Sequence, residues 1–234
     1  PLFAHPGSDL FDLFCGGVVL DQVVLMQALI DQVGMPTELP DKLTPLTKED
    51  LLQAMWKAWM GYFGAAPKKE SIWVILGHIM LETGLQHCHN YNLGNVKSKD
   101  GDGYDYQFFG CGEEIPLSMA NAWKAKDPAL VVIKRVYEVK GKKMASVWLE
   151  PPHWASRFRA FDDILEGATD HIALLTKRFT LAWPYVVEGD PAAFSHALKQ
   201  QNYYTADEAQ YTKTLVGTYA AISKLAFDYD SLPI

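Results

Sequence analysis

The feature that most constrains the fold is a change of hydrophobic period in the middle of the chain. Apolar residues recur at helical spacing before residue 84 and again after residue 160, whereas the segment between them has no helical period. Helices followed by a small glycine-rich β insertion and then by more helices predict an α+β domain, with a mainly helical lobe and a small β-hairpin lobe. A cleft between two such lobes is a natural place for a ligand.

The individual elements follow from local patterns. Apolar stripes, capping residues and breakers predict helices near residues 18–33, 47–64, 72–83, 161–179 and 211–226. Residues 86–117 are rich in glycine and asparagine, so we expect loops and turns there. Two β-branched runs on either side of Gly141, at residues 130–139 and 144–149, predict a β-hairpin.

Charge divides the chain unevenly. Residues 1–41 hold six acids and no Lys or Arg, and so carry −6 of the formal net charge of −7. We therefore predict an acidic, helical N-terminal extension over residues 1–45 and a main domain over residues 46–234. The nearly neutral main domain lacks the basic footprint of a nucleic-acid-binding protein. No apolar run reaches the roughly 20 residues of a membrane span, and the absence of Lys or Arg before Lys42 argues against a secretory signal peptide.

The three cysteines are too few, and odd in number, for a disulfide framework. Three alternatives remain for Cys88 and Cys111: a bridge that pins the β insertion to the preceding helix, two free thiols, or a zinc site with His87 and His89. The histidines and cysteines lack the closely spaced pairs of known structural zinc sites. We accordingly expect no metal and no other cofactor.

Glu82 is the most unusual charged residue, because it ends a strongly apolar helix and is followed by Thr83 and Gly84. A helix C-terminus and an apolar neighbourhood both disfavour the ionised form of a carboxyl group and raise its pKa. A general acid at neutral pH needs such a raised pKa. Taken alone, the same position also suits a solvent-facing glutamate at a frayed helix end.

The surroundings of Glu82 resemble the lysozyme-like glycosidases that cut peptidoglycan, nearest the flagellar and autolysin glucosaminidase branch. The matching segments, in the family's order, are residues 77–84 (GHIMLETG), 90–97 (NYNLGNVK), 157–161 (RFRAF) and 203–207 (YYTAD), the last followed by Tyr211. The resemblance covers about residues 70–225 and implies a lysozyme-like fold in which Glu82 is the catalytic acid. By its match to a motif tyrosine, Tyr204 is the best candidate for a substrate contact.

Glycoside hydrolysis usually needs a second carboxylate, roughly 5–9.5 Å from the acid. Glu113 or its neighbour Glu114, in the β insertion, is our first choice, and Glu138 on the hairpin is the rival. A route without a second carboxylate also stays open. Among further substrate-binding candidates, Tyr91 offers a ring with a polar edge, which suits a sugar, and Asn92 is expected mainly to brace its loop.

The sequence therefore predicts a peptidoglycan glycoside hydrolase that cleaves either the N-acetylglucosaminyl or the N-acetylmuramyl bond. A lytic transglycosylase and a non-catalytic wall-binding or virion protein of the same fold are the alternatives. The expected place of action is the cell wall, in the periplasm or outside the cell. An origin as a bacteriolytic phage endolysin without a signal peptide is compatible with the sequence.

Overall fold

The computed structural model describes residues 35–229, 231 and 232. The chain divides into two compact units, residues 1–37 and 38–234. The helix expected over residues 18–33, the acidic residues before it and Cys15 lie outside the described residues. Residues 38–45, which we assigned to the extension, pair within the second unit through bridges from Glu38 to Tyr106 and from Leu43 to His89.

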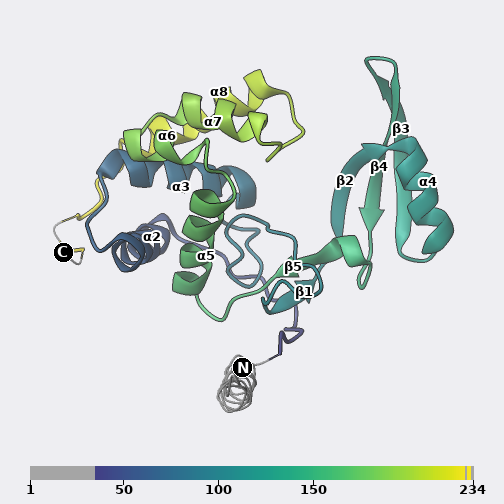
Figure 1. Cartoon of the computed structure of the whole chain (residues 1–234), viewed down its shortest axis with the longest axis horizontal. Helices are drawn as coiled ribbons and strands as arrows, with labels where there is room; N and C mark the ends of the chain where they lie inside the picture. The colour runs from purple at the N-terminus through teal and green to yellow at the C-terminus, as the bar shows by residue number, and fades with distance from the viewer. Residues whose placement is uncertain (1–34, 230, 233–234) are drawn as a thin grey trace, which may run out of the picture. The chain divides into compact units, whose positions relative to one another are not determined.

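The second unit combines helices with small antiparallel sheets, so the expected α+β class is confirmed (Figure 1). Its described helices are α2 (Lys48–Phe63), α3 (Lys69–Thr83), α4 (Leu117–Lys126), α5 (Ile164–Lys177), α6 (Trp183–Glu188), α7 (Pro191–Gln200) and α8 (Glu208–Ile222). Its strands are β1 (Tyr106–Phe108), β2 (Cys111–Pro116), β3 (Val131–Val139), β4 (Lys142–Leu149) and β5 (Arg157–Arg159). None of the described helices is both long enough and apolar enough to cross a membrane.

The expected helix boundaries are set by their capping residues. Thr47 accepts a hydrogen bond from the backbone N–H of Asp50 and begins α2, and Gly64 ends that helix in a left-handed conformation. Gly84 ends α3 in the same way, with a φ of 56° and a hydrogen bond from its N–H to the carbonyl of Met80. Because the chain turns sharply at Gly84, Glu82 falls in the last turn of a helix that is otherwise mostly buried.

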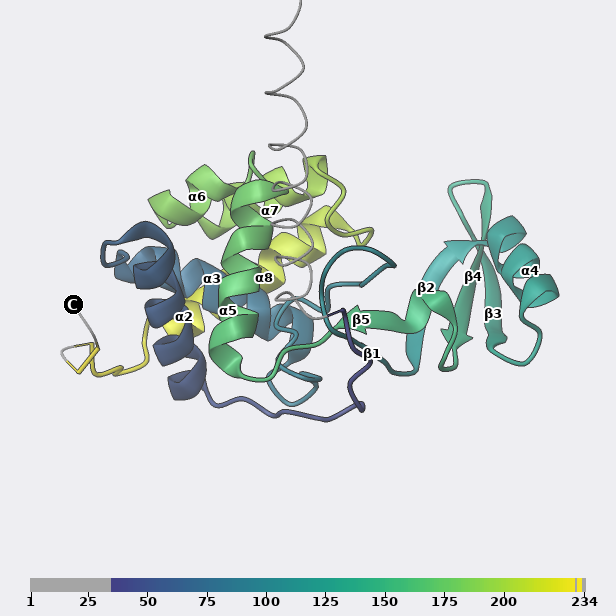
Figure 2. The same cartoon turned by 60° about the horizontal axis from the view of Figure 1, so that its bottom comes forward.

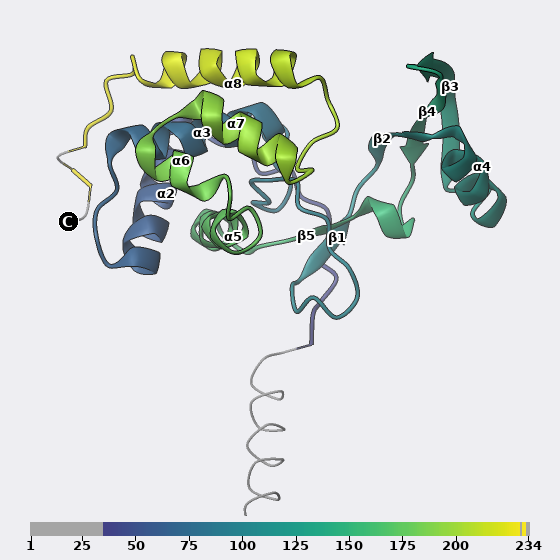
Figure 3. The ribbon, with the colours of Figure 1, turned by 45° about the horizontal axis from the view of Figure 1, so that its top comes forward.

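The helices share one hydrophobic core. Helix α2 packs against α5, and α8 lies along both α3 and α7 (Figure 3). The largest fully buried side chains of this core include Met55 of α2, Ile75 of α3, Leu175 of α5, and Phe194 and Leu198 of α7. The core thus fixes the end of α3, which carries Glu82, relative to α5 and α8.

The strands form two small sheets, and only part of this was expected. The hairpin of β3 and β4 is confirmed, with Lys140 and Gly141 both at positive φ in its turn. Strand β2 adds to β4 to give the order β2-β4-β3, and α4 covers this sheet with a separate small core. Strands β1 and β5 pair with each other (Figure 2).

The expectation of loops alone over residues 86–117 is wrong, because β1 and β2 lie there. Strand β2 holds one glycine, two glutamates and one proline, residue types of low β-propensity, and it forms because its backbone pairs with β4. Helices α4, α6 and α7 were also not expected. Helix α4 has only one fully buried residue, Ala120, so it lacks the apolar stripe that reveals a helix in a sequence.

Candidate active site

Glu82 is anchored through its backbone as well as its helix. Its main-chain carbonyl accepts a hydrogen bond of 2.8 Å from the side-chain amide of Asn95. This bond satisfies one of the carbonyl groups that the end of α3 leaves without a helical partner. It also ties the loop after α3 to the residue that we expect to be catalytic.

The side chain of Glu82 is 21% exposed, and its carboxyl group has two close polar neighbours. The Tyr211 hydroxyl donates a hydrogen bond of 2.8 Å to Oε1, and Nε2 of His78 lies 3.6 Å from the same atom. Burial raises the pKa of Glu82 above its usual value, and the bond from Tyr211 opposes this effect only in part. The group is therefore biased toward the protonated state that a general acid requires.

Two buried histidines lie behind the carboxyl group. Nδ1 of His78 is 3.3 Å from Nε2 of His171 on α5, and both side chains are almost completely buried. Burial lowers the pKa of His78 well below its usual value and that of His171 to about 4. Both rings are neutral at neutral pH, so neither supplies a positive charge that would favour ionised Glu82.

A pair of stacked tyrosines supports the site, Tyr211 on α8 and Tyr204 in the loop before that helix. The ring of Tyr204 stacks on that of Tyr211 with centroids 3.7 Å apart, and the Tyr204 hydroxyl donates to the carbonyl of Ser195 at 3.2 Å. Tyr204 therefore holds the tyrosine that bonds to Glu82. A direct contact between Tyr204 and substrate stays a prediction.

Two cavities meet beside Glu82. One has a volume of about 280 Å³ and is lined by Glu82, Gly94, Asn95, Val96, Lys97, Leu174, Arg178, Phe179, Asn202 and Tyr203. The other has a volume of about 350 Å³ and is lined by His87, His89, Asn95, Lys97, Phe109, Gly110, Cys111, Gly112, Glu113 and Phe158. Because Asn95 and Lys97 line both, the two cavities adjoin, and Glu82 and Glu113 border neighbouring compartments.

Lys97 holds Glu113 at the border of these cavities. Its Nζ lies 2.8 Å from Oε1 of Glu113, donates to the carbonyl of Ala155 at 2.6 Å and sits 3.9 Å above the ring of Phe158. The lysine thereby joins the loop after α3 to both β2 and the segment before β5. Of the two glutamates of β2, Glu113 is the one that lines this cavity.

The two other candidates for the second carboxylate lie elsewhere. Glu114 points to the opposite side of β2, where the hydroxyl of Tyr137 donates to it and lowers the pKa of its carboxyl group. Glu138 is exposed on β3, opposite Lys143 of β4. Neither residue lines the cavity beside Glu82 or the one beside Glu113. The sequence could not separate Glu113 from Glu114, because only the pairing of β2 decides which of them faces the cavity.

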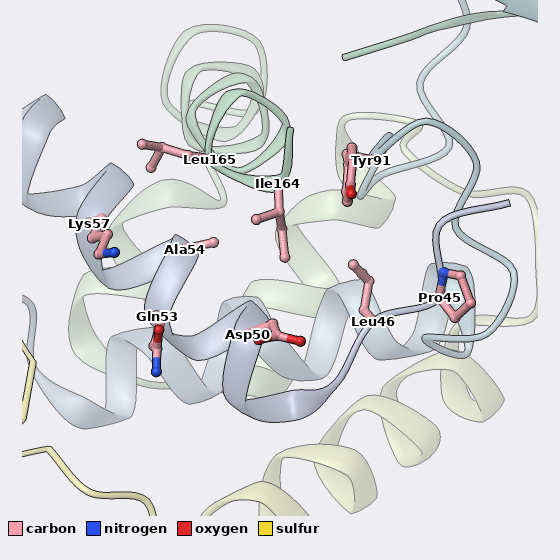
Figure 4. Close-up of a pocket in the computed structure, with 9 residues that line it drawn as sticks. All are labelled: Pro45, Leu46, Asp50, Gln53, Ala54, Lys57, Tyr91, Ile164 and Leu165. Atoms are coloured by element: carbon pink, nitrogen blue, oxygen red, sulfur yellow. The ribbon is translucent and has the colours of Figure 1, made fainter. Parts of the chain in front are cut away.

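Tyr91 and Asn92 follow α3 but do not line the cavity beside Glu82. Tyr91 borders a different cavity, of about 280 Å³, between α2 and the start of α5 (Figure 4). Asn92 is almost fully buried and braces its loop, because its side chain bonds to both backbone groups of Val96 and to the carbonyl of Arg159. Bracing is the role expected for Asn92, whereas a substrate contact of Tyr91 stays a prediction.

Cys88 and Cys111 are both free thiols in the structure. Cys88 is buried, which raises the pKa of its thiol to about 11, and Cys111 lies 3.4 Å from Nζ of Lys97. Within residues 35–229, 231 and 232, no three His, Cys, Asp or Glu side chains gather as metal ligands would.

Several residues of the site were not singled out from the sequence. Tyr211 was noticed only as the end of a motif, and the roles of His78, Asn95, Lys97 and Arg178 were not expected. The spacing of His78 and Glu82, four residues apart on one helix, was an available signal that the two side chains are neighbours. The contacts of the others join segments far apart in the chain, and no local pattern reveals them.

No protein-family model matches the chain, and no curated protein matches it. Among solved structures, the chain is similar to a C-terminally truncated glycoside hydrolase domain of FlgJ from Salmonella typhimurium. The sequence identity is 17%, and the match covers 77% of this chain and 100% of that domain with a TM-score of 0.40. At this identity the likeness assigns no role to any residue.

Proposed function

We propose that the protein is a glycoside hydrolase that cleaves the glycan strands of peptidoglycan, with Glu82 as the general acid. The observation that carries this proposal is the mostly buried carboxyl group of Glu82, which has a raised pKa and borders a cavity. The order of the motif segments around it supports the substrate class. Because the substrate is the wall, we propose that the protein acts in the periplasm or outside the cell.

In this mechanism Glu82 donates its proton to the glycosidic oxygen as the bond from that oxygen to the anomeric carbon breaks. Glu82 becomes a carboxylate in the same step. The hydrogen bond from Tyr211 then strengthens, because a bond to a charged acceptor is stronger than one to a neutral acceptor. Tyr211 thus favours the state of Glu82 that proton transfer produces.

Glu113 is our proposal for the second carboxylate. It borders the cavity that adjoins the one beside Glu82, and the ammonium group of Lys97 fixes its side chain. In that position it is suited to take a proton from the water that attacks the anomeric carbon, or to attack that carbon itself. Glutamine variants of Glu113, Glu114 and Glu138, assayed side by side, test the choice. We expect only Glu113→Gln to lose most activity, and a loss confined to Glu138→Gln would contradict it.

A lytic transglycosylase is the second candidate, and one observation favours it. Glu82 is the only carboxylic acid among the residues that line its cavity in the described part of the chain. A transglycosylase needs only this one group, which acts as acid and then as base while the sugar attacks its own anomeric carbon. Mass spectrometry of the fragments separates the two reactions, since the anhydro product lacks the water that a hydrolase adds.

The decisive experiment is Glu82→Gln, measured by loss of turbidity of purified cell walls. The change is nearly isosteric and removes the transferable proton, so we expect the rate to fall by about 10²- to 10⁴-fold. Glu70→Gln is the matched control, because Glu70 is an exposed carboxylate in the first turn of the same helix. Substantial activity in Glu82→Gln would refute the assignment. Binding to walls without any cleavage by the wild type would favour a non-catalytic wall protein.

The stability of Glu82→Gln provides the folding control. Since the pKa of Glu82 is raised in the folded state, that state holds the proton more tightly than the unfolded chain does. The wild type therefore loses stability as the pH rises from the unfolded pKa through the folded one, and glutamine removes this loss. We expect the melting temperature of the variant, relative to wild type, to rise with pH across that window and to stay level above it.

A further inference from the structure

Arg178 is a cation of the Glu82 cavity that has no anionic partner in the part of the chain that the structure describes. It caps the C-terminal end of α5, is exposed and lines the same cavity as Glu82. Among the described residues, its guanidinium group makes no ion pair and no hydrogen bond. By contrast, Arg157 and Arg159 are each paired with an aspartate. Arg178 therefore remains available to a ligand.

The cavity beside Glu82 is lined by more cations than acids. Its lining holds two cations, Lys97 and Arg178, and one carboxylic acid, Glu82. Lys97 is already neutralised by Glu113 at 2.8 Å. Glu82 is biased toward its neutral form by burial. Arg178 is the lining cation that makes no ion pair within the described part of the chain, so the cavity suits an anionic group.

The backbone of Arg178 is held in place, and its guanidinium group lies 5.4 Å from the centroid of the Phe179 ring. Its backbone N–H donates to the carbonyl of Leu174 at 3.0 Å, and its carbonyl accepts from the side-chain amide of Gln201 at 3.2 Å. Burial raises the pKa of the Tyr203 hydroxyl, a negative charge on Glu82 adds to this effect, and the positive charge of Arg178 opposes it. Arg178, Glu82 and Tyr203 line the same cavity.

We propose that Arg178 binds a carboxylate of the substrate and so selects an acidic glycan over a neutral one. This inference rests on the proposed function. In peptidoglycan the carboxylate has two possible sources, the lactyl group of the muramic acid residue or an acidic residue of the attached stem peptide. A guanidinium group suits either source, since its planar fork matches the two oxygens of a carboxylate.

Binding, measured by calorimetry on the whole 234-residue chain, tests this proposal without requiring turnover. In a Glu82→Gln background, Arg178→Gln is compared with Lys177→Gln, a matched control because Lys177 is an exposed neighbour that does not line the cavity. The ligands are peptide-free glycan strands, muropeptides with free or amidated stem carboxylates, and N-acetylglucosamine oligomers of equal length. We expect Arg178→Gln to weaken binding of the acidic ligands about 10-fold, as loss of a charge-assisted bond does, and to leave the neutral oligomers unaffected.

The ligands also identify the source of the carboxylate. A loss on peptide-free strands assigns the lactyl group, whereas a loss that occurs only with stem peptides and disappears on their amidation assigns the peptide. Arg178→Lys should recover part of the affinity, because it restores the charge without the fork. Equal losses on acidic and neutral ligands, no loss beyond that of Lys177→Gln, or no binding of any ligand would overturn the proposal.

Failure of this inference is distinguishable from failure of the proposed function. If the wild type cleaves walls but binding does not depend on Arg178, the inference fails and the function stands. If the wild type cleaves no glycan while binding depends on Arg178, the function fails and the carboxylate site stands.

Discussion

Removal of the Tyr211 hydroxyl should move the pH dependence of the reaction. In Tyr211→Phe the ring and its stacking on Tyr204 remain, but Glu82 loses the 2.8 Å bond that favours its ionised form. A hydrogen bond to a charged group contributes about 1.5–3 kcal/mol, and one to a neutral group about 0.5–1.5 kcal/mol. The difference, about 1–1.5 kcal/mol, makes ionisation of Glu82 up to roughly tenfold less favourable.

The assay is the pH profile of kcat/KM on purified walls. Because the acid must be protonated, activity declines as the pH rises through the pKa of Glu82, and we expect this decline at higher pH in Tyr211→Phe. Tyr219→Phe is the matched control, since it removes a hydroxyl from the same helix without touching Glu82. A decline at unchanged or lower pH would refute the roles given to Tyr211 and to Glu82 as the titrating acid.

Two further predictions concern how the site is held. Tyr204→Phe should keep the stack on Tyr211 and most activity, whereas Tyr204→Ala should lose about 2 kcal/mol of stability in urea denaturation and several-fold in kcat/KM; equal, small effects would contradict this role. Gly167→Ala should cost about 3 kcal/mol of unfolding free energy, because its Cβ would lie 2.0 Å from the carbonyl oxygen of Tyr91. Gly217→Ala on α8, where space is open, should instead gain about 0.5–1 kcal/mol, and a similar result for both would disprove the close approach.

The sequence by itself determined the elements whose signals are local. A capping threonine and a left-handed glycine bound α2, an apolar run ending at Gly84 defines α3, and Gly141 marks the turn of the β3–β4 hairpin. The same local reasoning singled out Glu82, since an acid at the end of an apolar helix is conspicuous in the sequence alone. It also predicted the direction of the pKa shift of Glu82, because burial and the helix end are both visible in the sequence.

Only the tertiary structure decided which residues surround Glu82. Tyr211 follows it by 129 residues, and the loop after α3, the end of α5 and the start of α8 converge on it because their helices share one core. Pairing of β2 with β4, which the composition of β2 did not predict, turned Glu113 toward Lys97 and Glu114 toward Tyr137. The spacing of apolar side chains along the chain indicates whether a segment is a helix or a strand. Which distant segments pack together depends instead on how the side chains of the whole core fit one another.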